Sequence, residues 1–326
     1  EEMEECEQVQ KITLSNLDKV KNDKDQFIKA NNNYKKTIGI LLAACLLLAS
    51  GYTFALRKVE SKFFKSITND IKEGIKRQGN EIIPELKKIT EEITQKSKSG
   101  NDINIWNINP KKNNKYIIFC DGIDDNMMFH QEDLLRNWVN KGYGIIKFDY
   151  CGVGKSTGTY NQKGCKESLE AVIDYLNQNG VKNENIGLIG HSMGTGVVSE
   201  FAKDNKVAFV TLVEPFDKFK NAIKCNINDL ENCPKFIKKI VSAIPNWMIP
   251  IKNTFNNIEN LKKSQNNLLI ITSKDDKVVP PTLTKNLYSK LSNKQNISYE
   301  EFETGGHFFT DEKIGKIWEF INKNVK

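Results

Sequence analysis

The chain has 326 residues, 39% of them hydrophobic, and a formal net charge of +7. This length suffices for one sizeable α/β domain with extensions and argues against two independent enzymes. The charge comes from lysines scattered along the chain, without the arginine-rich or aromatic-interleaved runs of nucleic-acid modules, so a solvated basic surface is favoured over nucleic-acid binding, with attraction to anionic lipid headgroups as the second interpretation.

The N-terminal part combines a polar tail with an apolar segment. Residues 1–36 open with an acidic cluster and become rich in lysine and asparagine, which predicts a polar tail. Thr37–Leu56 is uncharged, lies between two basic pairs and is long enough to cross a hydrocarbon core as a helix. A secretory signal is the weaker alternative, because a long charged segment precedes the stretch and no small-x-small cleavage site follows it. We therefore predict a transmembrane helix over 37–56, and its equally basic flanks leave its orientation open.

A charged segment, residues 57–100, follows the apolar stretch. Isoleucine and phenylalanine recur there at helical spacing in two stripes, one over Phe63–Ile75 and one over Ile82–Ile93. This pattern predicts a helical stalk or linker whose helices pack on the domain that follows. A helix lying in the membrane interface beside the anchor is the alternative.

From residue 101 to residue 326, segments of strand character alternate with segments of helical periodicity. This alternation predicts an α/β domain with a mostly parallel sheet covered by helices on both faces. The expected strands are Ile103–Ile108, Tyr116–Cys120, Gly144–Asp149, Asn185–Ile189, Ala208–Val213, Leu268–Thr272 and Ile297–Phe302. The expected helices are Glu132–Asn140, Lys166–Gln178, Met193–Lys203, Thr282–Leu291 and Thr310–Asn324.

One helical insertion, Lys218–Leu261, interrupts this alternation. It occupies the place in the chain where a lid would cover a site at the edge of the sheet. Because the insertion is short, we expect a small cap and an accessible pocket.

A short motif stands at the predicted junction between the strand Asn185–Ile189 and the helix Met193–Lys203. Residues Gly190–Gly194 read Gly-His-Ser-Met-Gly, and a strand followed by a helix is the context that a nucleophile elbow requires. The glycines let strand and helix approach closely around Ser192, whose backbone such a turn holds in a strained conformation. We therefore predict that Ser192 is a nucleophile at the carboxyl edge of the sheet.

A serine hydroxyl needs a base that takes its proton and an acid that orients the base. Of the three histidines, we interpret His191 as a packing residue and His130 as a surface or capping residue. His307 stands in a glycine-rich loop between the last strand and the last helix, where its imidazole can reach the edge of the sheet. The loop after the preceding strand offers Asp275 and Asp276 as acids, and either residue gives the chain order Ser, Asp, His.

Four segments in this order resemble the α/β-hydrolase superfamily. They are the elbow Gly190–Gly194, the loop Asp276–Pro280, the pair Gly306-His307 and the turn Phe148–Gly158. The likeness is strongest to the small-lidded branch of lysophospholipase-like and monoacylglycerol-lipase-like serine hydrolases, and it covers about Ile103–Lys326. In the pattern of this family the acid stands four residues before the proline, which selects Asp276 over Asp275.

The resemblance also implies an oxyanion hole formed by two backbone N–H groups, one from the residue after the nucleophile and one from the loop after the strand Tyr116–Cys120. These groups map to Met193 and Ile123. The chain departs from the family here, because Asp121-Gly122 replaces the usual His-Gly. A backbone donor survives this replacement, but a carboxylate that pointed inward would oppose the developing oxyanion.

These features together predict a membrane-anchored serine hydrolase of the α/β-hydrolase fold that cleaves carboxylic esters or thioesters through an acyl-enzyme. Ser192 attacks the carbonyl, His307 relays the proton and Asp276 holds the imidazole. This chemistry needs no metal ion and no organic cofactor, and the expected partners are a lipid or an acylated molecule and a membrane, without nucleic acid. A non-catalytic membrane-tethered binding or scaffold protein with the same fold is the alternative.

The cysteines indicate whether the protein lies in a reducing or an oxidising compartment. Seven cysteines stand at irregular spacings without a Cys-x-x-Cys pair, which favours free thiols in a reducing compartment. Cys120 and Cys151 fall at expected strand ends near the predicted site. We therefore expect a single-pass membrane protein whose catalytic domain lies on the cytosolic side.

Overall fold

The computed structural model describes residues 88–108, 114–122, 132–229 and 254–324. These residues form an eight-stranded sheet in the order β1-β2-β4-β3-β5-β6-β7-β8. Its strands are β1 (Thr90–Lys96), β2 (Asp102–Ile108), β3 (Tyr116–Cys120), β4 (Gly144–Phe148), β5 (Ile186–His191), β6 (Phe209–Val213), β7 (Leu268–Ser273) and β8 (Ile297–Phe302). The β1–β2 and β2–β4 pairs are antiparallel and all other neighbouring strands pair in parallel.

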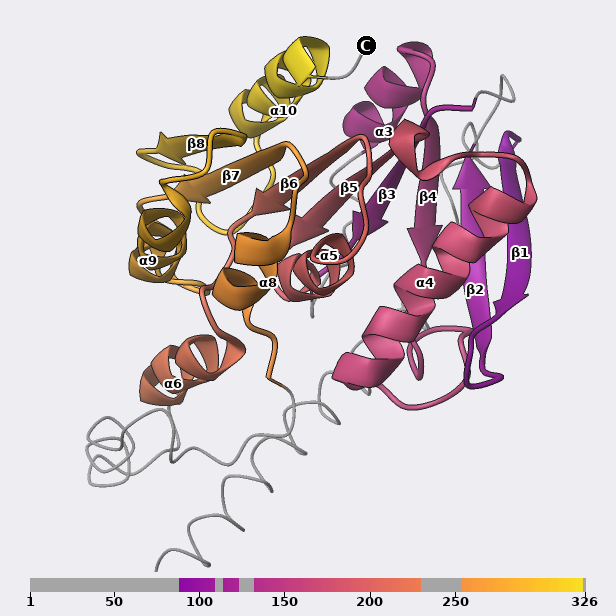
Figure 1. Cartoon of the computed structure of the whole chain (residues 1–326), viewed down its shortest axis with the longest axis horizontal. Coiled ribbons are helices and arrows are strands. Elements are labelled where there is room, and N and C mark those ends of the chain that lie inside the picture. Colours follow the sequence, from indigo (N-terminus) through magenta and orange to yellow (C-terminus); the bar gives the residue numbers. More distant parts are fainter. Residues whose placement is uncertain (1–87, 109–113, 123–131, 230–253, 325–326) are drawn as a thin grey trace, which may run out of the picture. The chain divides into compact units, whose positions relative to one another are not determined.

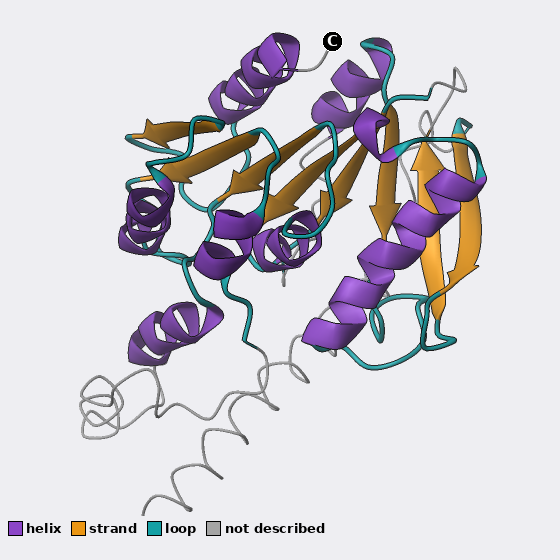
Figure 2. Ribbon diagram, viewed as in Figure 1, coloured by secondary structure: helices purple, strands orange, loops and turns teal. Residues whose placement is uncertain are grey.

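Helices cover both faces of this sheet, as Figure 2 shows. They are α3 (Glu132–Asn140), α4 (Gln162–Gln178), α5 (Gly194–Ala202), α6 (Phe219–Asp229), α8 (Asn257–Lys263), α9 (Pro281–Leu291) and α10 (Asp311–Asn324). In Figure 1, α3 and α10 lie on one face, while α4, α5, α8 and α9 lie on the other. The predicted α/β class, with a mostly parallel sheet between two helical layers, is confirmed.

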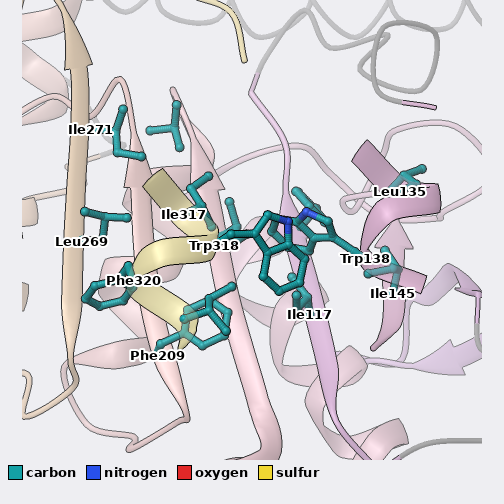
Figure 3. Packing of buried hydrophobic residues seen from close by; sticks show 14 of the residues in the cluster. Ile117, Leu135, Trp138, Ile145, Phe209, Leu269, Ile271, Ile317, Trp318 and Phe320 are labelled. Carbon is teal, nitrogen blue, oxygen red and sulfur yellow. The ribbon is translucent and has the colours of Figure 1, made fainter. Parts of the chain in front are cut away.

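The core that supports the edge of the sheet lies beneath α3 and α10 (Figure 3). The ring of Trp138 from α3 lies 5.0 Å from that of Trp318 of α10 and 5.1 Å from that of Phe119 of β3, measured between centroids. Strands β3, β5 and β6 are buried along their whole length, which is why their sequences are continuous apolar runs without alternation. Truncating a large buried ring of this kind to alanine typically costs about 3–5 kcal/mol, so this cluster contributes strongly to the stability of the sheet.

The helix expected over the last part of residues 57–100 is not found at Thr90–Lys96, and residues 57–87 lie outside the described part of the chain. Thr90–Lys96 is a strand, β1, which pairs antiparallel with β2 and extends the sheet by one edge strand. Ile89 and Ile93 are four residues apart, a spacing that places them on one face of a helix and equally on one face of a strand. Pairing with β2 decides between the two, so the sheet includes residues that precede residue 101.

The predicted cap insertion is described only at its two ends. Helix α6 begins it and helix α8 closes it, and an antiparallel bridge between Lys218 and Asn256 joins the two ends at their base. Residues 230–253 lie outside the described part of the chain, and so does the predicted transmembrane segment 37–56. Within the described residues, no helix combines the length and the apolar character that crossing a bilayer requires.

Candidate active site

Ser192 stands at a tight corner between β5 and α5. Its φ is +50°, a left-handed conformation that costs a residue with a side chain of order 1–3 kcal/mol. The corner is held by a hydrogen bond from the Ser192 N–H to the Val213 carbonyl of β6, at 3.0 Å, and by one from the Thr195 hydroxyl to the Ser192 carbonyl, at 2.5 Å. The structure thus contains the strained backbone that the sequence motif predicts.

The two glycines of the motif allow backbones to touch at this corner. A Cβ atom on Gly194 would lie 1.9 Å from the Cys120 carbonyl oxygen, and one on Gly190 would lie 2.7 Å from the Gly194 carbonyl oxygen. The first turn of α5 therefore packs directly on the end of β3. Met193, one of the two predicted oxyanion donors, lies in this turn and is buried, while Ile123, the other, lies outside the described residues.

His307 and Asp276 are hydrogen-bonded to each other. The His307 Nδ1 atom lies 2.8 Å from Asp276 Oδ2, and their side chains are 14% and 0% exposed. The second oxygen, Asp276 Oδ1, accepts the N–H groups of Val278 and Val279 at 2.8 and 3.0 Å. With the carboxylate ionised, Nδ1 must carry the proton of this bond, which leaves Nε2 of the ring as the free base.

The electrostatics of Asp276 support its ionised form. Burial acts to raise the pKa of this carboxyl group, but the hydrogen bond and charge of His307 and the two backbone N–H donors act in the opposite direction and prevail. The net pKa is lowered. Asp276 is therefore a carboxylate at neutral pH, as the orienting partner of an imidazole must be.

The neighbouring carboxylate has a different partner. Asp275 is exposed, and its Oδ1 accepts the Gly306 N–H at 2.7 Å, so it binds the backbone of the histidine loop and not the ring. The local sequence left both aspartates open, and the family pattern selected Asp276. The structure brings Asp276, and not Asp275, to the imidazole.

His191 packs against the predicted base. This residue is buried, and its Nε2–H donates a hydrogen bond of 2.7 Å to the carbonyl oxygen of His307. The two imidazole rings lie 4.7 Å apart between centroids. His307 therefore rests on the residue immediately before Ser192, which brings the elbow, His307 and Asp276 into one neighbourhood. His130 lies outside the described residues.

Asp121, the departure from the family pattern, is paired. Its carboxylate accepts two hydrogen bonds from the Lys147 ammonium, at 2.5 and 2.6 Å, and the Lys147 side chain is only 6% exposed. The buried ammonium of Lys147 offsets the negative charge of the Asp121 carboxylate. Sequence reasoning missed Lys147, although a lone lysine within the apolar strand Gly144–Phe148 is the signal of a buried partner.

Other reactive side chains of the described residues have no role in this arrangement. Cys120, Cys151 and Cys165 are buried free thiols, and burial raises the pKa of each above its ordinary value, so they are poor nucleophiles. Within the described ranges no three His, Cys, Asp or Glu side chains come together as they would around a metal ion.

Comparison with known sequences agrees with the α/β fold described above. Residues 115–251 match the family described as the alpha/beta hydrolase fold. Over 211 residues the chain is 31% identical to the putative alpha/beta hydrolase L404 of Acanthamoeba polyphaga mimivirus, which covers 62% of the chain and 72% of that protein. It is 28% identical over 188 residues to the human protein ABHD12B and 28% identical over 167 residues to the mouse lysophosphatidylserine lipase ABHD12. These matches cover 54% and 49% of the chain but only 50% and 41% of the two relatives.

Solved structures share the fold at low sequence identity. The Pyrococcus furiosus esterase Pf2001 has a TM-score of 0.61 at 18% identity, with 73% of this chain and 92% of the esterase covered. An alpha-beta hydrolase from Vibrio vulnificus has a TM-score of 0.62 at 16% identity, with 82% and 93% covered. At these identities the likeness concerns the arrangement of the backbone.

Proposed function

The chain belongs to the α/β-hydrolase family, and on that premise we propose that it is a serine hydrolase of carboxylic esters or thioesters. The observation that carries the proposal is the hydrogen bond between His307 Nδ1 and buried Asp276 Oδ2, on a histidine that rests against the residue before Ser192. A base oriented by a carboxylate next to a strained serine is the arrangement that activates a hydroxyl for attack.

The reaction divides into two acyl transfers. The Ser192 oxygen attacks the carbonyl carbon while its proton passes to Nε2 of His307, and the charge on the resulting imidazolium is compensated by Asp276. The tetrahedral oxyanion accepts the backbone N–H groups of Met193 and Ile123. As the intermediate collapses, His307 returns the proton to the leaving alcohol or thiol and an acyl-Ser192 ester remains. Water, deprotonated by the same imidazole, then releases the acid and regenerates the hydroxyl.

The oxyanion side of this mechanism depends on compensation of the negative charge of Asp121 by Lys147. Developing negative charge on the carbonyl oxygen is stabilised by N–H dipoles only if no uncompensated anion stands beside them. Lys147 contributes the compensating charge at 2.5 Å from the carboxylate. This pairing favours the catalytic hypothesis over a scaffold protein that has kept the fold without the chemistry.

The proposed substrates are lipids or acylated molecules presented at a membrane. This proposal is supported by the likeness to the lysophosphatidylserine lipases named above and by the apolar sequence Thr37–Leu56, which we propose to be a single-pass anchor with the catalytic domain on the cytosolic side. Basic residues near an anionic surface are attracted by about 1 kcal/mol each, and the segment Arg57–Lys98 is rich in lysine.

The membrane part of the proposal is tested separately from the chemistry. The full chain should cleave a medium-chain acyl ester faster in vesicles that contain phosphatidylserine than in vesicles of phosphatidylcholine alone, because the anchor and the basic segment concentrate it there. Equal rates on the two vesicles would remove the electrostatic part of the argument. A soluble short-chain ester, measured in parallel, reports the intrinsic activity.

The chemical part is tested by hydrolysis of p-nitrophenyl esters. The wild-type protein should release p-nitrophenol, whereas Ser192→Ala should reduce turnover by at least about 10⁴-fold with the fold retained, since the hydroxyl is the only group removed. Circular dichroism and urea unfolding serve as the control for the fold. Turnover that survives in Ser192→Ala would exclude Ser192 as the nucleophile.

A further inference from the structure

A charged side chain that the mechanism does not use is buried behind the histidine loop. Lys313 of α10 is fully buried, and its ammonium has three acceptors: Glu214 Oε1 at 2.6 Å, the Gly306 carbonyl at 3.0 Å and the Phe308 carbonyl at 2.7 Å. An ammonium has three N–H donors, so each of them is used. Two of the three end on the backbone of the histidine loop.

These two carbonyls lie on either side of His307. The carbonyl of His307 itself accepts the bond from His191 Nε2, so three consecutive carbonyls are held by side chains from other elements. The preceding glycines, Gly305 and Gly306, have φ values of +122° and +51°, conformations that only a permissive backbone adopts freely. Such a loop has little stiffness of its own, and its position depends on the groups that bind it.

Glu214 links the same ammonium to the loop that carries the acid. Its second oxygen, Oε2, accepts the hydroxyl of Thr272 at 2.9 Å and the N–H of Ser273 at 3.1 Å, both at the end of β7. The carbonyl of Ser273 in turn accepts the N–H of Asp276 at 3.3 Å. Glu214 therefore contacts the end of β7, which precedes the loop of Asp276. Its partner Lys313 contacts the backbone on both sides of His307.

The arrangement is costly for the fold. Glu214 has a φ of +51°, one of two such values among the described non-glycine residues, and the other belongs to Ser192. Burial raises the pKa of Glu214 to about 7 although the Lys313 ammonium acts to lower it, so desolvation outweighs the attraction within the pair. Buried ion pairs of this kind often contribute less stability than apolar residues of the same size. Stability alone therefore does not explain why the fold contains the buried Glu214–Lys313 pair.

We propose that Glu214 and Lys313, which we call the base-side pair, are positioning residues that fix the His307 imidazole and Asp276 relative to each other and to Ser192. The inference rests on the proposed function. Lys313 sets the position of the backbone on both sides of His307, and Glu214 sets the end of β7 from which Asp276 is presented. A displacement of about 1 Å in a reacting group can cost about 100-fold in rate, so small movements of this loop are sufficient to matter.

The test compares Lys313→Met with the double variant Lys313→Met/Glu214→Gln. The single variant removes the cation that acts to lower the pKa of Glu214, so the buried carboxyl group must either stay charged without a partner or take up a proton, and the urea midpoint of unfolding should fall. The double variant removes both charges and should recover most of that midpoint. If the pair positions the base, kcat for a soluble ester stays about 10- to 100-fold below wild type in both variants, with KM nearly unchanged.

A matched control lies on the same helix. Lys316 pairs with Glu319 at 2.8 Å on the surface, with its side chain 38% exposed, and Lys316→Met should leave both kcat and the urea midpoint near wild type. A double variant that regains wild-type kcat together with its stability would overturn the inference, because the pair would then act only on the fold.

A second readout does not depend on turnover. The proton shared between His307 Nδ1 and Asp276 Oδ2 should give a low-field proton resonance in the wild-type protein, and it should shift or broaden in the stable double variant but not in Lys316→Met. An unchanged resonance in the double variant would overturn the positioning role even if the protein hydrolysed no ester. A changed resonance in a protein that hydrolyses no ester would instead contradict only the proposed function.

Discussion

The two flanks of the elbow each contain a buried lysine–carboxylate pair, and the two pairs differ in what the lysine binds. On the flank of β3 and β4, Lys147 directs hydrogen bonds to both oxygens of Asp121, and we call these residues the oxyanion-side pair. On the flank of β6 and α10, Lys313 of the base-side pair gives one bond to Glu214 and two to backbone carbonyls.

The difference in hydrogen bonding indicates two roles, charge compensation for Lys147 and positioning for Lys313. A lysine whose bonds all end on one carboxylate cancels a charge and leaves the surrounding backbone to other restraints. A lysine that divides its donors between a carboxylate and a loop transmits the position of one strand to another segment. We infer that the first pair protects the electrostatics of the oxyanion hole, whereas the second determines the geometry of acid and base.

The largest expected effect comes from removing the carboxylate of Asp276, whose loop the base-side pair supports. Asp276→Asn should reduce kcat by about 10³–10⁴-fold, because an amide favours the wrong tautomer of His307 and no longer compensates the imidazolium. Asp275→Asn is the matched control and should cost less than about 10-fold, since Asp275 binds only the Gly306 N–H at the surface. Steady-state kinetics on a soluble ester gives both values, and the reverse ranking would reassign the acid.

Breaking the oxyanion-side pair should affect stability first. Lys147→Met leaves Asp121 without its cation and should cost about 3 kcal/mol in the free energy of unfolding, at the low end for a buried pair because Asp121 keeps some contact with solvent. The double variant Lys147→Met/Asp121→Asn should recover both this stability and the ester turnover. Recovery of turnover is expected for this double variant, whereas the double variant of the base-side pair should stay slow. If the Lys147→Met/Asp121→Asn variant also stayed slow, the two pairs would not differ in their effect on turnover.

The smallest expected effect is a dependence of stability on pH that Glu214 of the base-side pair contributes. The pKa of Glu214 is raised from 4.5 to about 7, so the folded protein binds this proton more tightly than the unfolded chain does. Its contribution to stability is fully present below about pH 4.5 and is lost as the pH rises through about 7. Glu214→Gln should therefore gain stability relative to wild type between about pH 5 and pH 8 in urea unfolding, and a difference that does not vary with pH would contradict the assignment.

The parts of the fold that leave local signals could be predicted from the sequence, and the site residues were proposed from the same kind of signal. Ser192, Asp276 and His307 stand in motifs at strand ends. β3 has the predicted bounds because its apolar run ends at Asp121-Gly122, and β8 and α3 have the predicted bounds as well. Asp276 could be separated from Asp275 only through the family pattern, since two adjacent carboxylates in one loop give the same local signal.

The parts that could not be predicted depend on contacts between distant segments. The spacing of Ile89 and Ile93 fits a helix and a strand, and only pairing with β2 decides between them. Lys313 stands four residues before Ile317 and so shares the apolar face of α10, yet a lysine in a chain so rich in lysine reads as a surface residue. Its burial requires Glu214, which lies 99 positions away in the sequence.

The central claim is that Ser192 is a nucleophile activated by His307, and covalent labelling tests it most directly. A fluorophosphonate probe should form one adduct with the wild-type protein, and mass spectrometry of its peptides should locate the phosphonyl group on Ser192. Asp276→Asn should be labelled much more slowly, and Ser192→Ala should not be labelled at all. No adduct on the folded wild-type protein, or an adduct on any other residue, would contradict the account.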